Sequence, residues 1–420
     1  GFGLVACISL SIHSDFGCRW YHTGLLRYFV MRFRIFQSLI FVCLVSGVVA
    51  AQTVDVSHQL EALRAGYERA QRYERAGDWA SAEREWQQLV SVAPDDAHAW
   101  TNLGVALNRQ DKPRAALAAW RQAIQIDPKI SGAHFNIGLT LVRAGEYAEA
   151  VAPLRRALAL EPDNEGARRA LAIALVGLEQ FPEASREIAL LLARSPRDAG
   201  LLELAAQSFM RQRRYAEAAT VLRRRLDLPE PAATGALWAQ YGDALDGAKR
   251  TIEAATAYER AVALEPDSTL RRYGLGYLYW KLYRYDEAER TLLEALRLEP
   301  DNARAAFTLG DLYLTKGDAQ RALPLLETSA RAYPNEFDTR FALGRALAQT
   351  GDAQRAIVEL RAAVLLNDTI ADGHYQLGRA LMQIGEREEG KRELERARTL
   401  HDAKRAAEAE RHRPQPPPVP

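Results

Sequence analysis

Prolines recur every 34 residues over most of this 420-residue chain, and this repeat constrains the fold more than any other feature. Two series keep the step, with one longer interval between them: Pro94, Pro128, Pro162 and Pro196, then Pro266, Pro300 and Pro334. Most of them are followed within two residues by Asp or Asn. Because proline cannot continue a helix and Asp or Asn caps the next one, each cluster is predicted to end one helix and begin another.

Two other positions in each unit are always small. One carries Ala82, Ala116, Ala150, Ala184, Ala218, Ala254, Ala288, Ala322, Ala356 and Gly390. The other carries Ala70, Gly104, Gly138, Ala172, Ala206, Gly242, Gly276, Gly310, Gly344 and Gly378. Small residues at two fixed points let two helices approach closely. Four residues after the first position comes a large residue, usually apolar, such as Trp120 or Leu360, on the same helix face. Glycines such as Gly145 and Gly351 fall midway, where a tight turn is predicted to join two helices.

These residues resemble the tetratricopeptide repeat. The motif runs Ala99-Trp100-Thr101-Asn102-Leu103-Gly104 and continues through Ala116, Trp120, Ala123 and Pro128. The resemblance implies an all-α solenoid, in which antiparallel helix pairs with a 34-residue period stack into a right-handed superhelix. Ten units are expected, five in 63–232 and five in 235–402, each stabilised by stacking on its neighbours. The family shares a shape while serving many unrelated partners, so the resemblance leaves the partner open.

The segment before the repeats reads as a secretory leader. Within 31–51, Met31 and two arginines precede an apolar run of about 15 residues and then small residues, which is the layout of a signal peptide. Residues 1–30 are interpreted as an upstream segment outside the working protein, and 52–62 as a lead-in. All three cysteines, Cys7, Cys18 and Cys43, precede Gln52. A remainder without thiols suits an oxidising compartment. We expect an exported protein of the periplasm or cell envelope, with an uncleaved membrane anchor as the alternative.

The fifth unit and the C-terminus depart from the repeat. Residues 226–234 (LDLPEPAAT) contain two extra residues, which indicate either a tolerated loop or a hinge between the two halves. The arginines nearby are interpreted as solvated surface: Arg211, Arg213, Arg214, Arg223, Arg224 and Arg225. Residues 403–413 are predicted to extend the last helix as a polar cap. The proline-rich tail 414–420 is predicted to be extended and unpaired.

Composition and motifs argue against several classes of function. With 55 basic and 54 acidic residues, there is no bulk charge for nucleic acid. There is no catalytic constellation, no glycine-rich loop after a strand, and no cofactor or metal motif. The histidines after the leader are interpreted as surface or groove residues: His58, His98, His134, His374, His401 and His412. We therefore expect no enzyme, no cofactor, and no membrane span after the leader.

Two classes of function remain. The first is a protein-interaction scaffold that binds a peptide or protein segment in a concave groove, which in this family is lined by the first helix of each unit. The second is a structural component of an envelope assembly that docks through its convex face or its ends. An aromatic and polar groove favours the first, whereas apolar patches on the second helices favour the second. The oligomeric state is left open.

Candidate groove residues follow from the same register. Asn102 and Asn136 match the asparagine of the carboxylate-clamp subfamily, but the basic partners of that clamp are missing. In units seven to ten, one position on the first helix is always aromatic, and charged or aromatic residues follow it by four or seven residues. These candidates are Tyr273, Tyr277, Trp280, Phe307, Asp311, Phe341, Arg345, Tyr375 and Arg379. Rings edged by charge are typical of binding hot spots, although an aromatic residue at this position also serves packing in such repeats.

Overall fold

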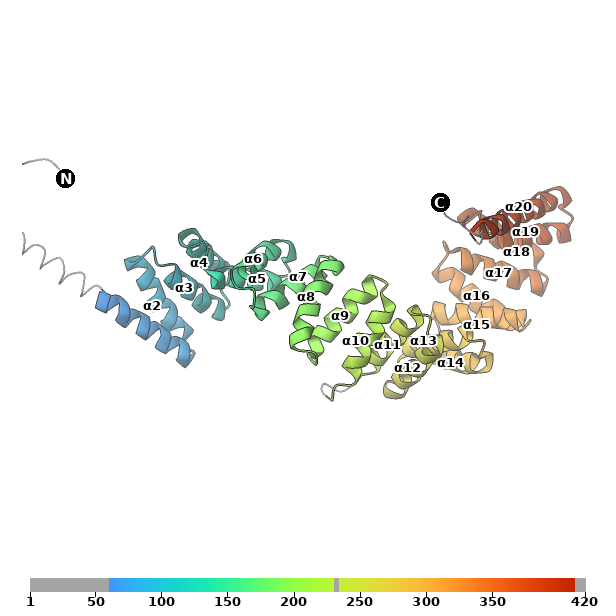
Figure 1. Cartoon of the computed structure of the whole chain (residues 1–420). Helices are drawn as coiled ribbons and strands as arrows, with labels where there is room; N and C mark the ends of the chain where they lie inside the picture. Colours follow the sequence, from blue (N-terminus) through green and yellow to red (C-terminus); the bar gives the residue numbers. More distant parts are fainter. Residues whose placement is uncertain (1–59, 230–233, 412–420) are drawn as a thin grey trace, which may run out of the picture. The chain divides into compact units, whose positions relative to one another are not determined.

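The computed structural model describes residues 60–229 and 234–411, and every regular element within these ranges is an α-helix (Figure 1). The prediction of an all-α solenoid of helix pairs is confirmed. The described residues fall into two compact units, divided between Asn136 and Ile137. The leader 1–51, the lead-in as far as residue 59, residues 230–233 of the predicted hinge and the tail 414–420 lie outside the described residues.

Each repeat consists of a first and a second helix joined by a short turn. The first helices are 60–76, α3 (Ala97–Arg109), α5 (Ser131–Ala144), α7 (Glu165–Gly177), α9 (Ala199–Arg211), α11 (Gly235–Gly247), α13 (Thr269–Lys281), α15 (Ala303–Thr315), α17 (Phe337–Thr350) and α19 (Ala371–Ile384). The second helices are α2 (Trp79–Val92), α4 (Pro113–Ile126), α6 (Tyr147–Leu160), α8 (Phe181–Arg194), α10 (Tyr215–Leu226), α12 (Thr251–Leu264), α14 (Tyr285–Leu298), α16 (Ala319–Ala332), α18 (Ala353–Leu366) and α20 (Arg387–Arg411).

Helix starts follow the proline clusters because polar side chains satisfy the first free backbone N–H groups. Asp96, Asn164, Asp198, Ser268 and Asn302 each accept a hydrogen bond from a backbone N–H in the first turn of the next helix. Local sequence therefore sets where these five first helices begin, whereas α17 and α19 begin without a side-chain cap.

The small residues allow the two helices of a unit to pack closely. A Cβ atom at Gly344 would lie 2.6 Å from Leu360 Cγ, and one at Gly310 would lie 2.7 Å from Leu326 Cγ. Both leucines are fully buried. The large residue four places after the alanine position therefore packs against the glycine of the partner helix, and this contact repeats along the chain.

The turn between the two helices requires a residue in the left-handed conformation. Five units place glycine there, with φ between 76° and 93°. The other five use Asp111, Glu179, Arg213, Lys249 and Tyr283, with φ between 57° and 64°. Since this region is costly for residues with a Cβ atom, these five turns carry backbone strain that the glycine turns avoid.

Stacking continues from unit to unit within the second compact unit. Each second helix packs on the next first helix, and neighbouring first helices also touch, as α13 does with α15, α15 with α17 and α17 with α19. The last helix, α20, continues to Arg411, and its residues beyond His401 are exposed. Among the described helices, none combines the length and apolarity that crossing a membrane requires.

Candidate functional site

Four aromatic residues occupy one register position on successive first helices: Tyr273 on α13, Phe307 on α15, Phe341 on α17 and Tyr375 on α19. None of the four is fully buried, and Tyr375 is 46% exposed. Tyr273 is half-buried, and burial raises the pKa of its hydroxyl, which also hydrogen bonds with Thr308. The row therefore combines packing with an accessible face.

Three aromatic side chains lie in succession along one face of α13, as the sequence predicts. The Tyr277 and Trp280 rings stack with centroids 5.8 Å apart, and the Tyr273 and Tyr277 centroids are 6.3 Å apart. Tyr277 is 37% exposed. Helical spacing of four and three residues places the rings in contact, as expected.

Three of the candidates link three first helices. The indole N–H of Trp280 donates to the Asp311 carboxylate, and Arg345 Nη1 lies 3.8 Å from Asp311 Oδ1. Burial raises the pKa of Asp311, while Arg345 and Trp280 act in the opposite direction. The sequence predicted Trp280 on the aromatic face of its helix and Asp311 and Arg345 at the charged edge of the groove, and the structure shows that the three interact with one another.

The two candidate arginines lie over aromatic rings. The Arg345 guanidinium carbon is 5.6 Å from the Phe341 ring centroid, and that of Arg379 is 5.8 Å from the Tyr375 centroid. Phe341 also stacks on Phe337, with centroids 5.3 Å apart. A cavity of about 700 Å³ opens between α17 and α19, and both arginines line it. The two arginines thus connect this cavity to the neighbouring aromatic rings, and arginine and aromatic side chains are the composition of a binding hot spot.

Asn102 on α3 and Asn136 on α5 are half-buried. They lie in the first compact unit, whereas the other nine candidates lie in the second. We therefore treat the nine candidates on α13, α15, α17 and α19 as the candidate site and name them the ring cluster. Its members are Tyr273, Tyr277, Trp280, Phe307, Asp311, Phe341, Arg345, Tyr375 and Arg379.

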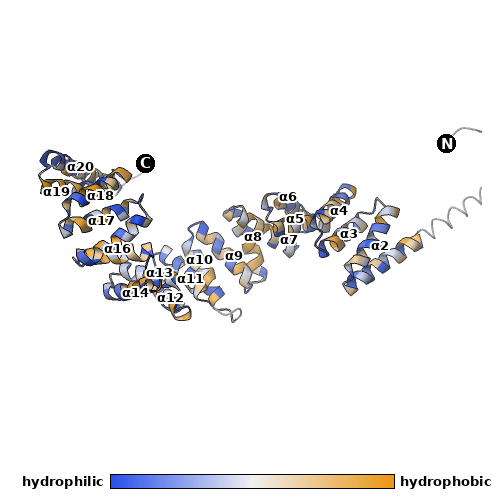
Figure 2. Cartoon of the chain, turned by 180° about the vertical axis from the view of Figure 1, so that it is seen from behind, coloured by the Kyte–Doolittle hydropathy of each residue, from blue (hydrophilic) through white to orange (hydrophobic). Residues whose placement is uncertain are grey.

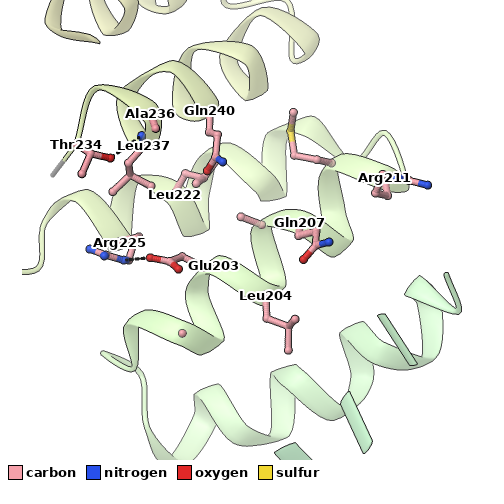
Figure 3. Close-up of a pocket in the computed structure, with 13 residues that line it drawn as sticks. Glu203, Leu204, Gln207, Arg211, Leu222, Arg225, Thr234, Ala236, Leu237 and Gln240 are labelled. Carbon is pink, nitrogen blue, oxygen red and sulfur yellow. Dashed lines mark hydrogen bonds and ion pairs between the residues drawn. The ribbon is translucent and has the colours of Figure 1, made fainter. Parts of the chain in front are cut away.

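A cavity of about 840 Å³ between α9 and α11 was not predicted (Figure 3). Arg225 of α10 lines it, is only 4% exposed, and donates from Nε to Glu203 Oε1 at 2.7 Å. The interpretation of the arginine group as solvated surface was wrong for this residue. Arg225 occupies a register position that is alanine in most units, so its long side chain enters the interior and reaches a carboxylate on α9.

The sequence contained part of the signal for this cavity. Arg225 at a position that is alanine in most units, and the two extra residues within 226–234, can both be seen in the sequence. The carboxylate partner was not visible, because Glu203 lies 22 residues before Arg225 and belongs to no repeated pattern. Glu203, Gln207 and Gln240 are the polar residues of this cavity that sequence reasoning missed.

His374 corrects a second interpretation. It was taken for a surface or groove residue, but the structure buries it. Its Nδ1 lies 2.6 Å from Glu393 Oε2, and its Nε2 lies 3.0 Å from the carbonyl oxygen of Asp368. The imidazole therefore ties α19 to α20 and to the preceding turn. No group of three or more His, Cys, Asp or Glu within the described ranges is arranged to hold a metal ion.

Exposed apolar residues also occur on second helices. Figure 2 colours the ribbon by hydropathy and shows hydrophobic and hydrophilic residues alternating along the helices. They include Ile252 on α12, Leu293 on α14, and Val358 and Leu365 on α18. Three further ones, Val92, Leu264 and Leu366, share one register position on α2, α12 and α18. Val358 and Leu365, seven residues apart, share a face of α18. Single exposed apolar residues are ordinary on protein surfaces.

Comparison with protein families identifies the repeat. The sequence profile described as "Tetratricopeptide repeat" matches residues 169–236, 206–269, 240–303, 273–336 and 307–372. A second profile, "Cilia and flagella-associated protein 70 middle TPR-like domain", matches residues 68–200. The search of curated proteins found no match.

Similar solved structures include MamA from Desulfovibrio magneticus RS-1, with 20% identity over 40% of this chain and 96% of that one, at a TM-score of 0.38. Another is YrrB, described as a TPR protein with an unusual peptide-binding site, with 22% identity over 46% of this chain and 100% of that one, at 0.40. Yeast Tom70 shares 13% identity over 81% of this chain and 85% of its own, at 0.37. All three TM-scores are low, so the family profiles carry the classification.

Proposed function

Because the chain is a solenoid of tetratricopeptide repeats, we propose that it is a protein-interaction scaffold that holds an extended segment of a partner protein against the ring cluster. The observation that carries the proposal is the row of four aromatic residues at one register position, with exposed rings at Tyr277 and Tyr375. Large, rigid rings with an accessible face gain binding energy at little entropic cost, which is why hot spots favour them.

The spacing of the row fits an extended ligand. Packed helices lie about 8–10 Å apart, and an extended chain advances about 3.3–3.6 Å per residue. One repeat therefore corresponds to about three ligand residues, and the four rings to a segment of about ten. A peptide of twelve residues is long enough to test the whole row.

The test is selection from a random display library of twelve-residue peptides on the full chain. We expect peptides to be enriched and to bind the double variant Tyr277→Ala/Tyr375→Ala about 30-fold more weakly, the scale of a hot spot of about 2 kcal/mol. Both rings are exposed, so circular dichroism should show unchanged helicity. The matched control is Tyr283→Ala, which removes an exposed ring at the turn between α13 and α14.

Two results would contradict the proposal. Absence of any enriched peptide would reject the scaffold function itself. Equal binding by the double variant and the unmodified protein would move the binding site away from the ring cluster.

Docking through the second helices is the alternative function, and the exposed pair Val358 and Leu365 on α18 favours it, since Leu365 is 86% exposed. A photo-crosslinking residue at position 365 should then capture a neighbour in intact cells, whereas one at position 375 should not. The opposite pattern would support binding at the ring cluster.

We also propose that the protein is exported and begins its mature form near Gln52. The support is the basic, apolar and small-residue order of 31–51, a segment outside the described residues. N-terminal sequencing of protein recovered from separated cell fractions tests this. A product that retains Met31 in the cytosol would rule it out.

A further inference from the structure

The cavity between α17 and α19 has an unbalanced charge. Its lining residues are Arg345, Ala348, Gln349, Gln376, Arg379, Ala380, Met382, Gln383 and Leu394. The lining thus contains two arginines and three glutamines but no carboxylate. A volume of about 700 Å³ is within the usual range of ligand pockets.

The cavity between α9 and α11 provides an internal comparison. There the buried Arg225 is neutralised by Glu203, which lines the same cavity (Figure 3). Between α17 and α19 this compensation is incomplete. The nearest acid to Arg345 is Asp311 at 3.8 Å, which does not line the cavity and already accepts from Trp280. Within residues 60–229 and 234–411, the structure gives Arg379 no ion pair.

Each of the two guanidinium groups lies over an aromatic ring of its own helix. Arg345 lies over Phe341 and Arg379 over Tyr375. An arginine that is already positioned loses less side-chain entropy when it binds, and it offers paired donors that match a carboxylate.

We infer that this cavity binds two acidic side chains, Asp or Glu, of the extended segment that the ring cluster holds. The inference rests on the proposed function and specifies the chemistry of the partner. Arg345 and Arg379 are one repeat apart, so two negative groups match them, whereas a terminal carboxylate would supply one. At about three ligand residues per repeat, the two acids are expected three residues apart. The three glutamines offer donors and acceptors to the ligand backbone between them.

The test uses the same twelve-residue library, displayed with fixed Gly-Ser flanks at both ends so that no variable residue carries a terminal carboxylate. We expect the selected peptides to be enriched in Asp and Glu at a spacing of three. A synthetic peptide of this kind should bind about 100-fold more tightly than its twin with Asn and Gln in place of the acids, because each of the two charge-assisted contacts is expected to contribute about tenfold. Fluorescence anisotropy measures both.

A double-mutant cycle ties the effect to the cavity. Arg379→Gln should weaken binding of the acidic peptide about tenfold and leave binding of the amide twin unchanged. Because Arg379 is exposed, the substitution should not unfold the protein. Arg290→Gln is the matched control, because Arg290 is an exposed arginine on the second helix α14.

Each contrary result has a separate meaning. Equal binding of the two peptides, or an equal loss for both in Arg379→Gln, overturns the inference and leaves the scaffold function intact. Binding that requires a free C-terminal carboxylate also overturns it. Failure to select any peptide overturns the proposed function and this inference together.

Discussion

Replacing Gly344 with alanine should destabilise the ninth repeat, although alanine is the better helix former. The new Cβ would lie 2.6 Å from Leu360 Cγ and 3.3 Å from the Leu360 backbone nitrogen. Overpacking of this kind costs about 1–3 kcal/mol, while the gain in helix propensity is about 1 kcal/mol. The net expected loss is about 0–2 kcal/mol in the free energy of opening α17 and α18.

The effect of Gly344→Ala on stability should change sign when the Leu360 side chain is removed. Leu360→Ala alone should cost about 2–5 kcal/mol, because it empties a fully buried site. In that background Gly344→Ala meets no leucine side chain, fills part of the cavity and favours the helix. It should then stabilise the repeat by about 1 kcal/mol.

Native-state hydrogen exchange is the suitable assay, since it reports opening helix by helix in an array that need not unfold in one step. Gly132→Ala is the control, because a Cβ there meets nothing within 4 Å and should only add helix propensity. A stabilising Gly344→Ala in the unmodified protein, or the same change in both backgrounds, would refute the claim that glycine at this position is kept for close packing.

Three further predictions follow from the turns, the buried acids and the insertion. Tyr283→Gly should raise the free energy of unfolding by about 0.5–1 kcal/mol, measured by urea denaturation, because φ is 59° there and glycine adopts it without strain. Burial raises the pKa of Asp243 in the folded state. The protonated carboxyl therefore contributes to stability below the unfolded-state pKa, and this contribution is lost as the pH rises through the folded-state pKa. Asp243→Asn should be more stable than the unmodified protein at pH 7, and the difference should vanish by about pH 4. Limited proteolysis should cut 226–234 before any site in 97–198, because a linker opens more readily than stacked helices, and uniform resistance would count against a hinge.

The sequence was sufficient for most of the fold because the fold is local. A helix pair is specified by residues that lie within one 34-residue period: the cap after proline, the glycine or alanine of the first helix, and the large residue that packs on it. Gly310 and Leu326, for example, are 16 residues apart, and the same two positions carry a small and a large residue in every unit. Repetition turned individually weak signals into a consistent pattern.

Polar pairs were harder to interpret than the apolar contacts. Arg225 with Glu203, 22 residues away on a neighbouring helix, is a pair that no other described unit repeats, so no periodicity indicates it. His374 with Glu393 occupies the register positions of two other pairs, each 19 residues apart: Arg168 with Glu187 and Arg340 with Glu359. The repeat of small and apolar residues does not indicate ion pairs of this kind. Both Arg225 and His374 were consequently assigned to the surface, and the structure buries both.

The difficulty of predicting ion-pair partners from sequence also limits what the sequence says about binding. The sequence shows arginines in the fifth, ninth and tenth units without showing which of them are neutralised from within. In the structure Arg225 is buried and paired, so it contributes to the shape of its cavity and offers little charge to a ligand. Arg379 is exposed over Tyr375 in a cavity whose lining contains no acid, so its charge is available to a ligand. Charge compensation therefore separates the structural Arg225 from Arg379, for which we propose a binding role, and on this proposal the acidic contacts of the partner are expected at the α17–α19 end of the ring cluster.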